Sequence, residues 1–202
     1  MEQNSSAERS VVWHAGQVSG DERARHLHQR PATVWLTGLS GAGKSTIACA
    51  LERRLLDDGQ SAYVLDGDNV RHGLNRDLGF SPRDRAENIR RIAEVARLMN
   101  DAGLIVITAF ISPYREDREA ARAIIGPAEF LEVHVSTPIQ VCEERDPKGM
   151  YKLARAGELP SFTGVSAPYQ APQAPVCRID TGIHGVDECV GLLMGLLRPF
   201  LN

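Results

Sequence analysis

Residues 33–46 read Thr-Val-Trp-Leu-Thr-Gly-Leu-Ser-Gly-Ala-Gly-Lys-Ser-Thr. The first five residues are rich in β-branched and aromatic side chains, which predicts a short strand that stops at Gly38. From Gly38 the sequence matches Gly-x-x-x-x-Gly-Lys-Ser/Thr in full, and Ile47, Leu51 and Leu55 then recur at helical spacing. A strand, a glycine-rich turn and an amphipathic helix in this order predict a phosphate-binding loop.

The residue types of this loop suit a triphosphate with its magnesium ion. Small residues let the backbone N–H groups surround phosphate oxygens, and the helix that follows adds the positive end of its dipole. We expect Lys44 to reach the β- and γ-phosphates and the hydroxyl of Ser45 to ligate Mg²⁺. The residues expected to bind ATP are Gly38, Leu39, Ser40, Gly41, Ala42, Gly43, Lys44, Ser45 and Thr46.

Strand and helix patterns alternate along the rest of the chain, which predicts an α/β fold: a three-layer, doubly wound parallel sheet of the P-loop nucleoside triphosphate hydrolase and kinase type. The expected strands are 33–37, 62–65, 104–108, 130–135 and 176–179, and the expected helices are 44–58, 82–100, 116–125, 138–144 and 186–197. We expect residues 1–30 to be an N-terminal extension, partly ordered at best, and 31–202 to be one kinase domain. The Lys-, Arg-, Gly- and Pro-rich segment 145–175 is interpreted as a lid.

Composition excludes several classes of protein. The chain has 202 residues and a formal charge of −3, which argues against a sequence-independent nucleic-acid binder. Its four cysteines show no C-x-x-C spacing, so we expect reduced thiols in a cytoplasmic protein rather than a zinc site. The sequence contains no signal-peptide pattern and no apolar run of membrane-spanning length, so we expect no membrane partner.

The carboxylates Asp66 and Asp68 follow the second predicted strand. In an open α/β sheet the carboxyl ends of the strands border the ligand crevice, so these groups are placed to hold Mg²⁺ or to orient an attacking hydroxyl. A GTPase would need a guanine-reading Asn-Lys-x-Asp segment, which is missing from the sequence, and the best candidate for a translocating ATPase strand ends without a carboxylate. The pattern therefore favours a kinase of a small acceptor.

Arg71 and Arg85 flank a loop that contains Phe80. Arginine side chains suit phosphate or sulfate oxygens, and an aromatic ring suits the face of a base, so this group indicates an anionic, nucleotide-like acceptor. Arg90 and Arg91 are interpreted instead as part of a solvated helix face. Cations in the lid could neutralise charge that builds up on the transferred phosphoryl group.

Several motifs in order resemble the adenylylsulfate kinase (APS kinase) family. They lie within the stretches 35–46, 65–74, 77–80, 85–91, 108–113, 145–149, 154–157 and 162–164. The resemblance runs from about residue 13 to the C-terminus. It implies that ATP phosphorylates the 3′-hydroxyl of adenosine 5′-phosphosulfate (APS), giving 3′-phosphoadenosine 5′-phosphosulfate (PAPS) and ADP. It also implies a homodimer and a functional link to ATP sulfurylase.

The resemblance assigns site residues one by one. The implied acceptor-binding residues are Arg71, Phe80, Arg85, Asn88, Ile111, Lys152 and Phe162. The implied catalytic residues are Lys44, Asp66, Asp68 and Ser112, with Ser45 and Asp66 at the metal. The serine at the position of Ser112 has been described as a phosphoserine intermediate, which a direct in-line transfer does not need. Leu153 and Gln170 depart from the family pattern, which often has Lys and Glu there.

Two alternatives remain open at this point. One is a P-loop kinase for another small acceptor, such as a sugar acid; the Arg71–Phe80–Arg85 group argues against it because a neutral sugar needs no arginine pair. The other is a nucleotide-binding regulatory subunit without turnover, against which the intact Lys44 and Asp66 argue.

Overall fold

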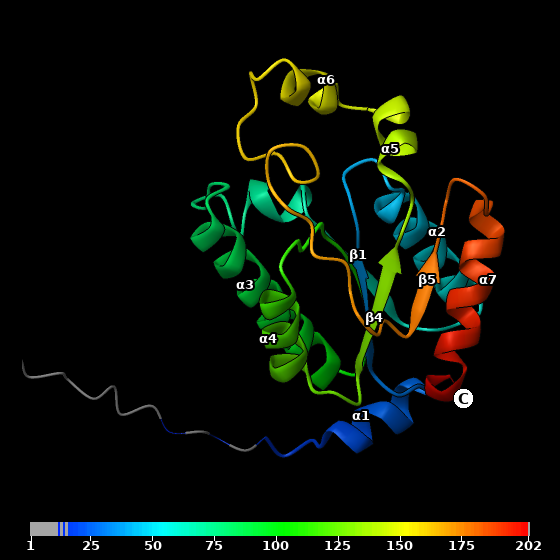
Figure 1. Ribbon diagram of the computed structural model, residues 1–202. Coiled ribbons are helices and arrows are strands. Elements are labelled where there is room, and N and C mark those ends of the chain that lie inside the picture. Colours follow the sequence, from blue (N-terminus) through cyan, green and yellow to red (C-terminus); the bar gives the residue numbers. More distant parts are fainter. Residues whose placement is uncertain (1–11, 13, 15, 202) are drawn as a thin grey trace, which may run out of the picture.

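Five parallel strands form one sheet in the order β2-β3-β1-β4-β5 (Figure 1). This computed structural model describes residues 12, 14 and 16–201. The strands are β1 (Ala32–Thr37), β2 (Ala62–Asp66), β3 (Ile105–Ala109), β4 (Phe130–Val135) and β5 (Cys177–Ile179). Every residue of β1 and β3 is buried, as expected for central strands covered on both faces. The predicted α/β fold is confirmed, and each strand lies within one residue of its expected bounds.

Helices cover the two faces of the sheet. The helices are α1 (Gly20–Leu27), α2 (Lys44–Asp57), α3 (Pro82–Asp101), α4 (Arg115–Ile125), α5 (Ile139–Arg145), α6 (Met150–Arg155) and α7 (Val186–Leu197). Single 3₁₀ turns, η1 (Asn69–His72) and η2 (Arg198–Phe200), complete the fold. Because side chains alternate along a strand, Val34 and Leu36 of β1 pack with α2 and α7, whereas Trp35 packs with α3 and α4.

Local signals explain where the helices begin. The hydroxyl of Ser81 accepts a hydrogen bond from the Asp84 backbone N–H (3.1 Å), and Pro82 occupies the first turn of α3, as predicted. The sequence did not predict α6, because its six residues bury only Tyr151 and Ala154 and give no sustained period. This short helix lies inside the predicted lid segment, above the carboxyl ends of the strands (Figure 1).

The helix α1 also lies in a segment expected to be partly ordered at best. Its side chains are nearly all polar, so it carries no periodic apolar signal, yet Ser19 caps it and Arg23 pairs with Asp101 of α3 (3.2 Å). The fully buried Gln29 then donates to the carbonyls of Ser61 and Gly103, both at 2.8 Å. The segment that follows α1 is therefore fastened to the kinase core, and a boundary at residue 30 stays a prediction.

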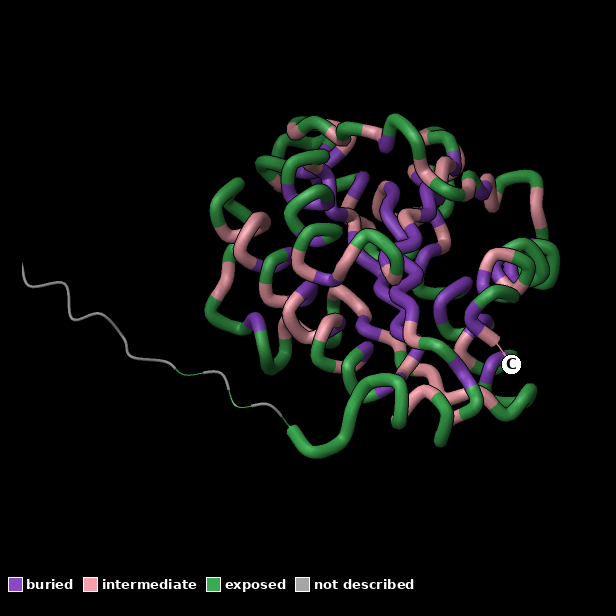
Figure 2. The backbone as a smooth tube through the Cα atoms, turned by 90° about the horizontal axis from the view of Figure 1, so that it is seen from below, coloured by how far each residue is buried: buried purple, intermediate pink, exposed green. Residues whose placement is uncertain are grey.

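The sheet is the buried centre of the molecule (Figure 2). The sequence suggested that Val11–Trp13 could pack on the domain; Val12 is exposed, while Val11 and Trp13 lie outside the described residues. Within residues 12, 14 and 16–201, no helix is both long enough and apolar enough to cross a membrane.

Candidate active site

A cavity of about 1130 Å³ lies at the carboxyl ends of the strands. The loops that follow β1, β2, β3 and β5 line it, together with Arg145, Pro147, Lys148, Met150 and Phe162 from the predicted lid. A doubly wound sheet binds ligands at this edge because the connecting loops diverge there. The cavity holds the predicted triphosphate loop at one side and the predicted acceptor residues at the other.

The phosphate-binding loop needs glycine at positions where a side chain would collide with the neighbouring backbone. A Cβ atom on Gly38 would meet the carbonyl oxygen of Val135, and Gly41 has a φ of 73° with the Cys142 carbonyl oxygen 2.9 Å from its would-be Cβ. These contacts press the loop against β4 and α5. The loop is therefore shaped by buried packing before any ligand arrives.

Two threonine hydroxyls form hydrogen bonds to the same loop. The hydroxyls of Thr137 and Thr181 donate to the carbonyl oxygen of the fully buried Ala42, at 3.2 and 2.9 Å. Arg145 in turn donates to the hydroxyl and the carbonyl oxygen of Thr181 (2.6 and 2.7 Å). The sequence did not predict these anchors, because each contact joins residues that are more than 35 positions apart in the chain.

The side chain of Lys44 folds back on its own loop. Its ammonium group donates to the carbonyl oxygens of Gly38 (2.9 Å) and Leu39 (2.7 Å). Only 8% of Lys44 is exposed, and this burial lowers its pKa to about 8. A buried ammonium that binds only carbonyl dipoles is well placed to exchange them for phosphate oxygens, which carry full negative charge.

The hydroxyl of Ser45 and the carboxylate of Asp66 meet at the cavity wall. Ser45 donates to Asp66 Oδ2 (2.6 Å), and Asp66 Oδ1 accepts from the backbone N–H of Asp68 (2.9 Å). An all-oxygen donor set fits Mg²⁺, which prefers hard ligands. No closed cluster of three His, Cys, Asp or Glu side chains occurs in the described part of the chain. Mg²⁺ commonly takes one or two protein ligands and completes its shell with phosphate and water.

Lys148 from the lid reaches across the cavity to Asp68. Its ammonium nitrogen forms an ion pair with Asp68 Oδ2, and both side chains remain more than half exposed. Lys152, the lid lysine expected at the acceptor, does not line the cavity; its backbone N–H donates to Asp146 Oδ2 (3.1 Å). The structure therefore places Lys148, rather than Lys152, at the cavity beside the predicted catalytic residue Asp68.

The predicted acceptor residues Arg71, Phe80 and Arg85 form one group. The guanidinium carbon of Arg71 lies 4.4 Å from the centre of the Phe80 ring, and that of Arg85 lies 5.7 Å from it. Partial burial lowers the pKa of both arginines, although a guanidinium stays charged at any working pH. Because Phe80 is 58% exposed at the cavity, it offers a ring face flanked by two cations.

Arg85 also connects the acceptor side to the lid. It donates to the carbonyl oxygen of Ser161 (2.9 Å) and the hydroxyl of Thr163 (3.3 Å). Between them Phe162 lines the cavity and packs edge-on against Tyr151, with ring centres 5.0 Å apart. The lid is thus held to the acceptor helix α3 through Arg85.

Ser112 and Asn88 lie on the inner wall beside Ile111. The backbone of Ser112 has a φ of 41°, and its buried hydroxyl accepts a hydrogen bond from the indole N–H of Trp35 (3.2 Å). Asn88 Oδ1 accepts from Asn75 Nδ2 (2.9 Å). The structure thus gathers every predicted acceptor residue except Lys152 around one cavity.

Comparison with known proteins identifies the family. The family model for adenylylsulphate kinase matches residues 30–180. An adenylyl-sulfate kinase from Shewanella pealeana is 60% identical over 93% of this chain and 91% of its own. The structure of an APS kinase from Mycobacterium tuberculosis in complex with AMPPNP and APS matches with a TM-score of 0.81 and 52% identity, covering 84% of this chain and 99% of that one.

The chain belongs to the adenylylsulphate kinase family. A structure of a hexameric APS kinase from Thiobacillus denitrificans also matches, with 36% identity and a TM-score of 0.66 over 87% of this chain and 30% of that chain. The family resemblance read from the motifs is confirmed by these findings. The roles of the individual residues remain predictions.

One departure from the family pattern has a structural counterpart. Gln170 Oε1 accepts a hydrogen bond from the backbone N–H of Arg115 (3.0 Å), a contact that a glutamate carboxylate would also make.

Sequence reasoning missed Arg118, which is 2% exposed, bonds Glu132 (2.6 Å) and donates to the Ser112 carbonyl oxygen (2.7 Å). Arg118 shares one face of α4 with the buried Ala121 and Ile125. This helical spacing could have indicated from the sequence that Arg118 is buried.

Proposed function

We propose that this chain transfers the γ-phosphoryl group of ATP to the 3′-hydroxyl of APS, giving PAPS and ADP. The single observation that carries this proposal is the shared cavity. Its triphosphate loop, with Lys44 and the Ser45–Asp66 pair, lies opposite the Arg71–Phe80–Arg85 group. Membership of the adenylylsulphate kinase family supports the same reaction.

At the donor side, the loop 38–46 cradles the phosphates of ATP, and the ammonium of Lys44 moves from its loop carbonyls to the β- and γ-phosphate oxygens. Ser45 and Asp66 would hold Mg²⁺, which supplies positive charge between the two terminal phosphates. The threonine anchors behind Ala42 keep the loop in place while the ligand exchanges.

At the acceptor side, Arg71, Arg85 and Asn88 bind the phosphosulfate and nearby polar atoms. Phe80 stacks on the adenine, and Phe162 covers its other face from the lid. Because Asn88 Oδ1 is occupied by Asn75, the amide N–H groups of Asn88 are left to donate to an anionic oxygen. Ile111 lies beside the acceptor on the cavity wall.

Asp68 orients or deprotonates the 3′-hydroxyl, and Lys148 neutralises charge on the transferred phosphoryl group as the lid closes. The transfer is direct and in line, without a phosphoserine. A phosphoryl group on Ser112 would have to displace the Trp35 hydrogen bond and place a dianion where 2% of the residue is exposed.

We further propose a homodimer, a functional link to an ATP sulfurylase that supplies APS, and a cytoplasmic location. The unpaired state of Cys49, Cys142, Cys177 and Cys189 supports a reducing compartment.

A coupled assay of ADP release tests the reaction. ATP and Mg²⁺ are supplied with APS, with a sugar acid such as gluconate, or with no acceptor. We expect release that depends on APS, together with PAPS detected as product. Release with the sugar acid alone, or nucleotide binding without release, would contradict the proposal.

The Arg85→Ala variant tests the acceptor assignment. Because Arg85 contacts both the ring of Phe80 and the lid, we expect its loss to raise KM for APS by about tenfold or more, with KM for ATP nearly unchanged. Unchanged kinetics for APS would exclude Arg85 from the acceptor pocket.

A further inference from the structure

The acceptor loop, residues 69–81 between β2 and α3, has few apolar anchors: Val70 packs partly buried against the core near the start of the loop, and Leu78 is half-buried. Leu74 is 47% exposed and Phe80 is 58% exposed, whereas the one fully buried residue of the loop is the polar Asn75. A segment that buries so little apolar surface depends on polar contacts for a fixed conformation. This matters because the loop carries Arg71 and Phe80.

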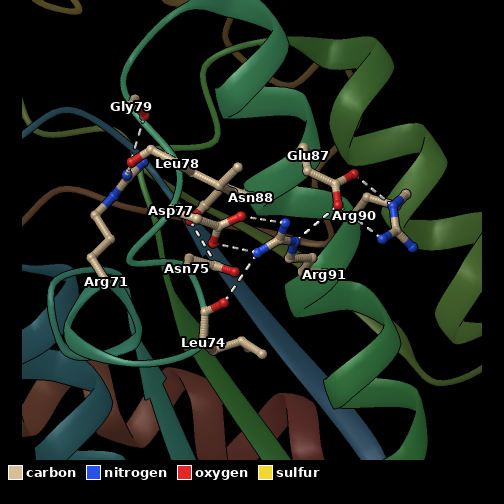
Figure 3. A network of polar contacts seen from close by, with 10 residues as sticks. All are labelled: Arg71, Leu74, Asn75, Asp77, Leu78, Gly79, Glu87, Asn88, Arg90 and Arg91. Atoms are coloured by element: carbon tan, nitrogen blue, oxygen red, sulfur yellow. Dashed lines mark hydrogen bonds and ion pairs between the residues drawn. The ribbon is translucent and has the colours of Figure 1, made fainter.

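Arg91 of α3 supplies the largest share of these contacts (Figure 3). Its two terminal nitrogens donate to the two carboxylate oxygens of Asp77 (2.7 and 2.8 Å), in a bidentate ion pair. One of them also donates to the Leu74 carbonyl oxygen (3.1 Å), and Nε donates to Glu87 on its own helix (2.9 Å). Arg91 therefore holds the loop at two points, three residues apart, while Glu87 fixes the guanidinium plane.

The part of the loop next to these two points holds Arg71. Its guanidinium donates to the carbonyl oxygens of Leu78 (3.1 Å) and Gly79 (3.2 Å), directly after Asp77. The same backbone leads into Phe80, over which Arg71 stacks. A shift of residues 77–79 would therefore move both the cation and the ring of the acceptor pocket.

We infer that Arg91, through Asp77 and Leu74, is a positioning residue for the acceptor: it fixes the loop so that Arg71 and Phe80 face the cavity. This inference rests on the proposed function and goes beyond it, because Arg91 does not line the cavity. It also corrects the interpretation of Arg91 as part of a solvated helix face, since its side chain is 26% exposed and each of its three nitrogens donates a hydrogen bond.

The neighbouring Arg90 provides a matched control. It lies on the same helix, bonds the same Glu87 (2.8 Å) and lies near Glu94 (3.8 Å), but forms no hydrogen bond or ion pair with residues 69–81, all of which the structure describes. Arg90→Met and Arg91→Met each remove one positive charge and that residue's hydrogen bonding to Glu87. They differ in the contacts to Asp77 and Leu74.

The experiment compares the two variants in the APS-dependent ADP-release assay. For Arg91→Met we expect KM for APS to rise about tenfold, while kcat and KM for ATP change less than about twofold. For Arg90→Met all three should stay within about twofold of the parent. Arg91→Lys should recover only part of the loss, because an ammonium cannot form the bidentate pair.

A double-mutant cycle with Asp77→Asn separates positioning from general destabilisation. Because Asp77 acts through its contact with Arg91, which Arg91→Met already removes, Arg91→Met/Asp77→Asn should raise KM for APS no more than Arg91→Met alone. Equal effects of Arg90→Met and Arg91→Met, or a fall in ATP affinity matching that for APS, would overturn the inference. Absence of APS-dependent turnover in the parent chain would instead contradict the proposed function.

Discussion

The two sides of the cavity are built in different ways. On the donor side, the loop around Ala42 is wedged between β4, α5 and two threonine hydroxyls, and its lysine is buried. On the acceptor side, the loop 69–81 is held by the partly exposed Arg91–Asp77 ion pair, a buried Asn75–Asn88 hydrogen bond and a cation–aromatic contact. The donor site is therefore built into the core, whereas the acceptor loop is held to α3 mainly by polar contacts. Substitutions on the donor side should therefore abolish function, whereas substitutions on the acceptor side should weaken it by degrees.

Removing the donor-side cation should have the largest effect. We expect Lys44→Ala to lower kcat by about 1,000-fold, because a preorganised cation at the γ-phosphate contributes as much as an oxyanion-hole donor. The measurement is ADP release at saturating ATP and APS, with the thermal midpoint as a check that the variant is folded. Activity within tenfold of the parent would show that Lys44 is not at the transferred group.

A matched pair of glycine substitutions compares the two sides directly. Gly38→Ala places a methyl group against the Val135 carbonyl oxygen in the core, and overpacking of this kind costs about 1–3 kcal/mol. Gly79→Ala meets only the side-chain carboxylate of Asp84, 3.0 Å from its would-be Cβ. We expect Gly38→Ala to lower the free energy of unfolding and ATP binding, and Gly79→Ala to alter only KM for APS. Equal losses of stability would contradict the contrast between the two sides.

The two lid lysines should differ as well. Lys148 pairs with Asp68 inside the cavity, whereas Lys152 does not line it. Loss of one charge-assisted contact at the reacting end predicts that Lys148→Ala lowers kcat by about tenfold. Lys152→Ala should lower it by less than about twofold if the structure shows the working position of α6. The opposite order would support the role that the family resemblance implied for Lys152.

The smallest expected effect is the partial uptake of a proton by the enzyme when ATP binds. Because burial lowers the pKa of Lys44 to about 8, roughly half of the ligand-free enzyme lacks this proton at pH 8. A bound triphosphate stabilises the ammonium and restores the proton, so we expect uptake of about half a proton per ATP at pH 8 and little at pH 6.5. Calorimetry in buffers of different ionisation enthalpy measures this number. Lys44→Arg should abolish the uptake, since a guanidinium does not titrate in this range.

Local patterns in the sequence were sufficient for the triphosphate loop and for the Arg71–Phe80–Arg85 group, but not for the long-range contacts that hold either loop in place. The strand, loop and helix around Lys44 are consecutive, so periodicity and glycine spacing predicted them within one residue. Arg71, Phe80 and Arg85 were also predicted to lie together, and they do. The role of Arg91 was not accessible, because it depends on partners 14 and 17 positions away whose approach is set by the loop conformation. Arg118 was missed although its helical spacing with Ala121 and Ile125 indicated a buried position; only its bond to Gln170, 52 positions away, was out of reach of local patterns.

Trp35 gives this molecule its own optical reporter. Its indole is fully buried, yet its N–H is bonded to the hydroxyl of Ser112 on the wall of the cavity. The chain has only one other tryptophan, Trp13, so replacing Trp13 by phenylalanine leaves a single fluorophore. Movement of Ser112 when APS binds would change the polarity around that indole. The fluorescence emission of Trp35 would then report APS binding in real time, without any added dye.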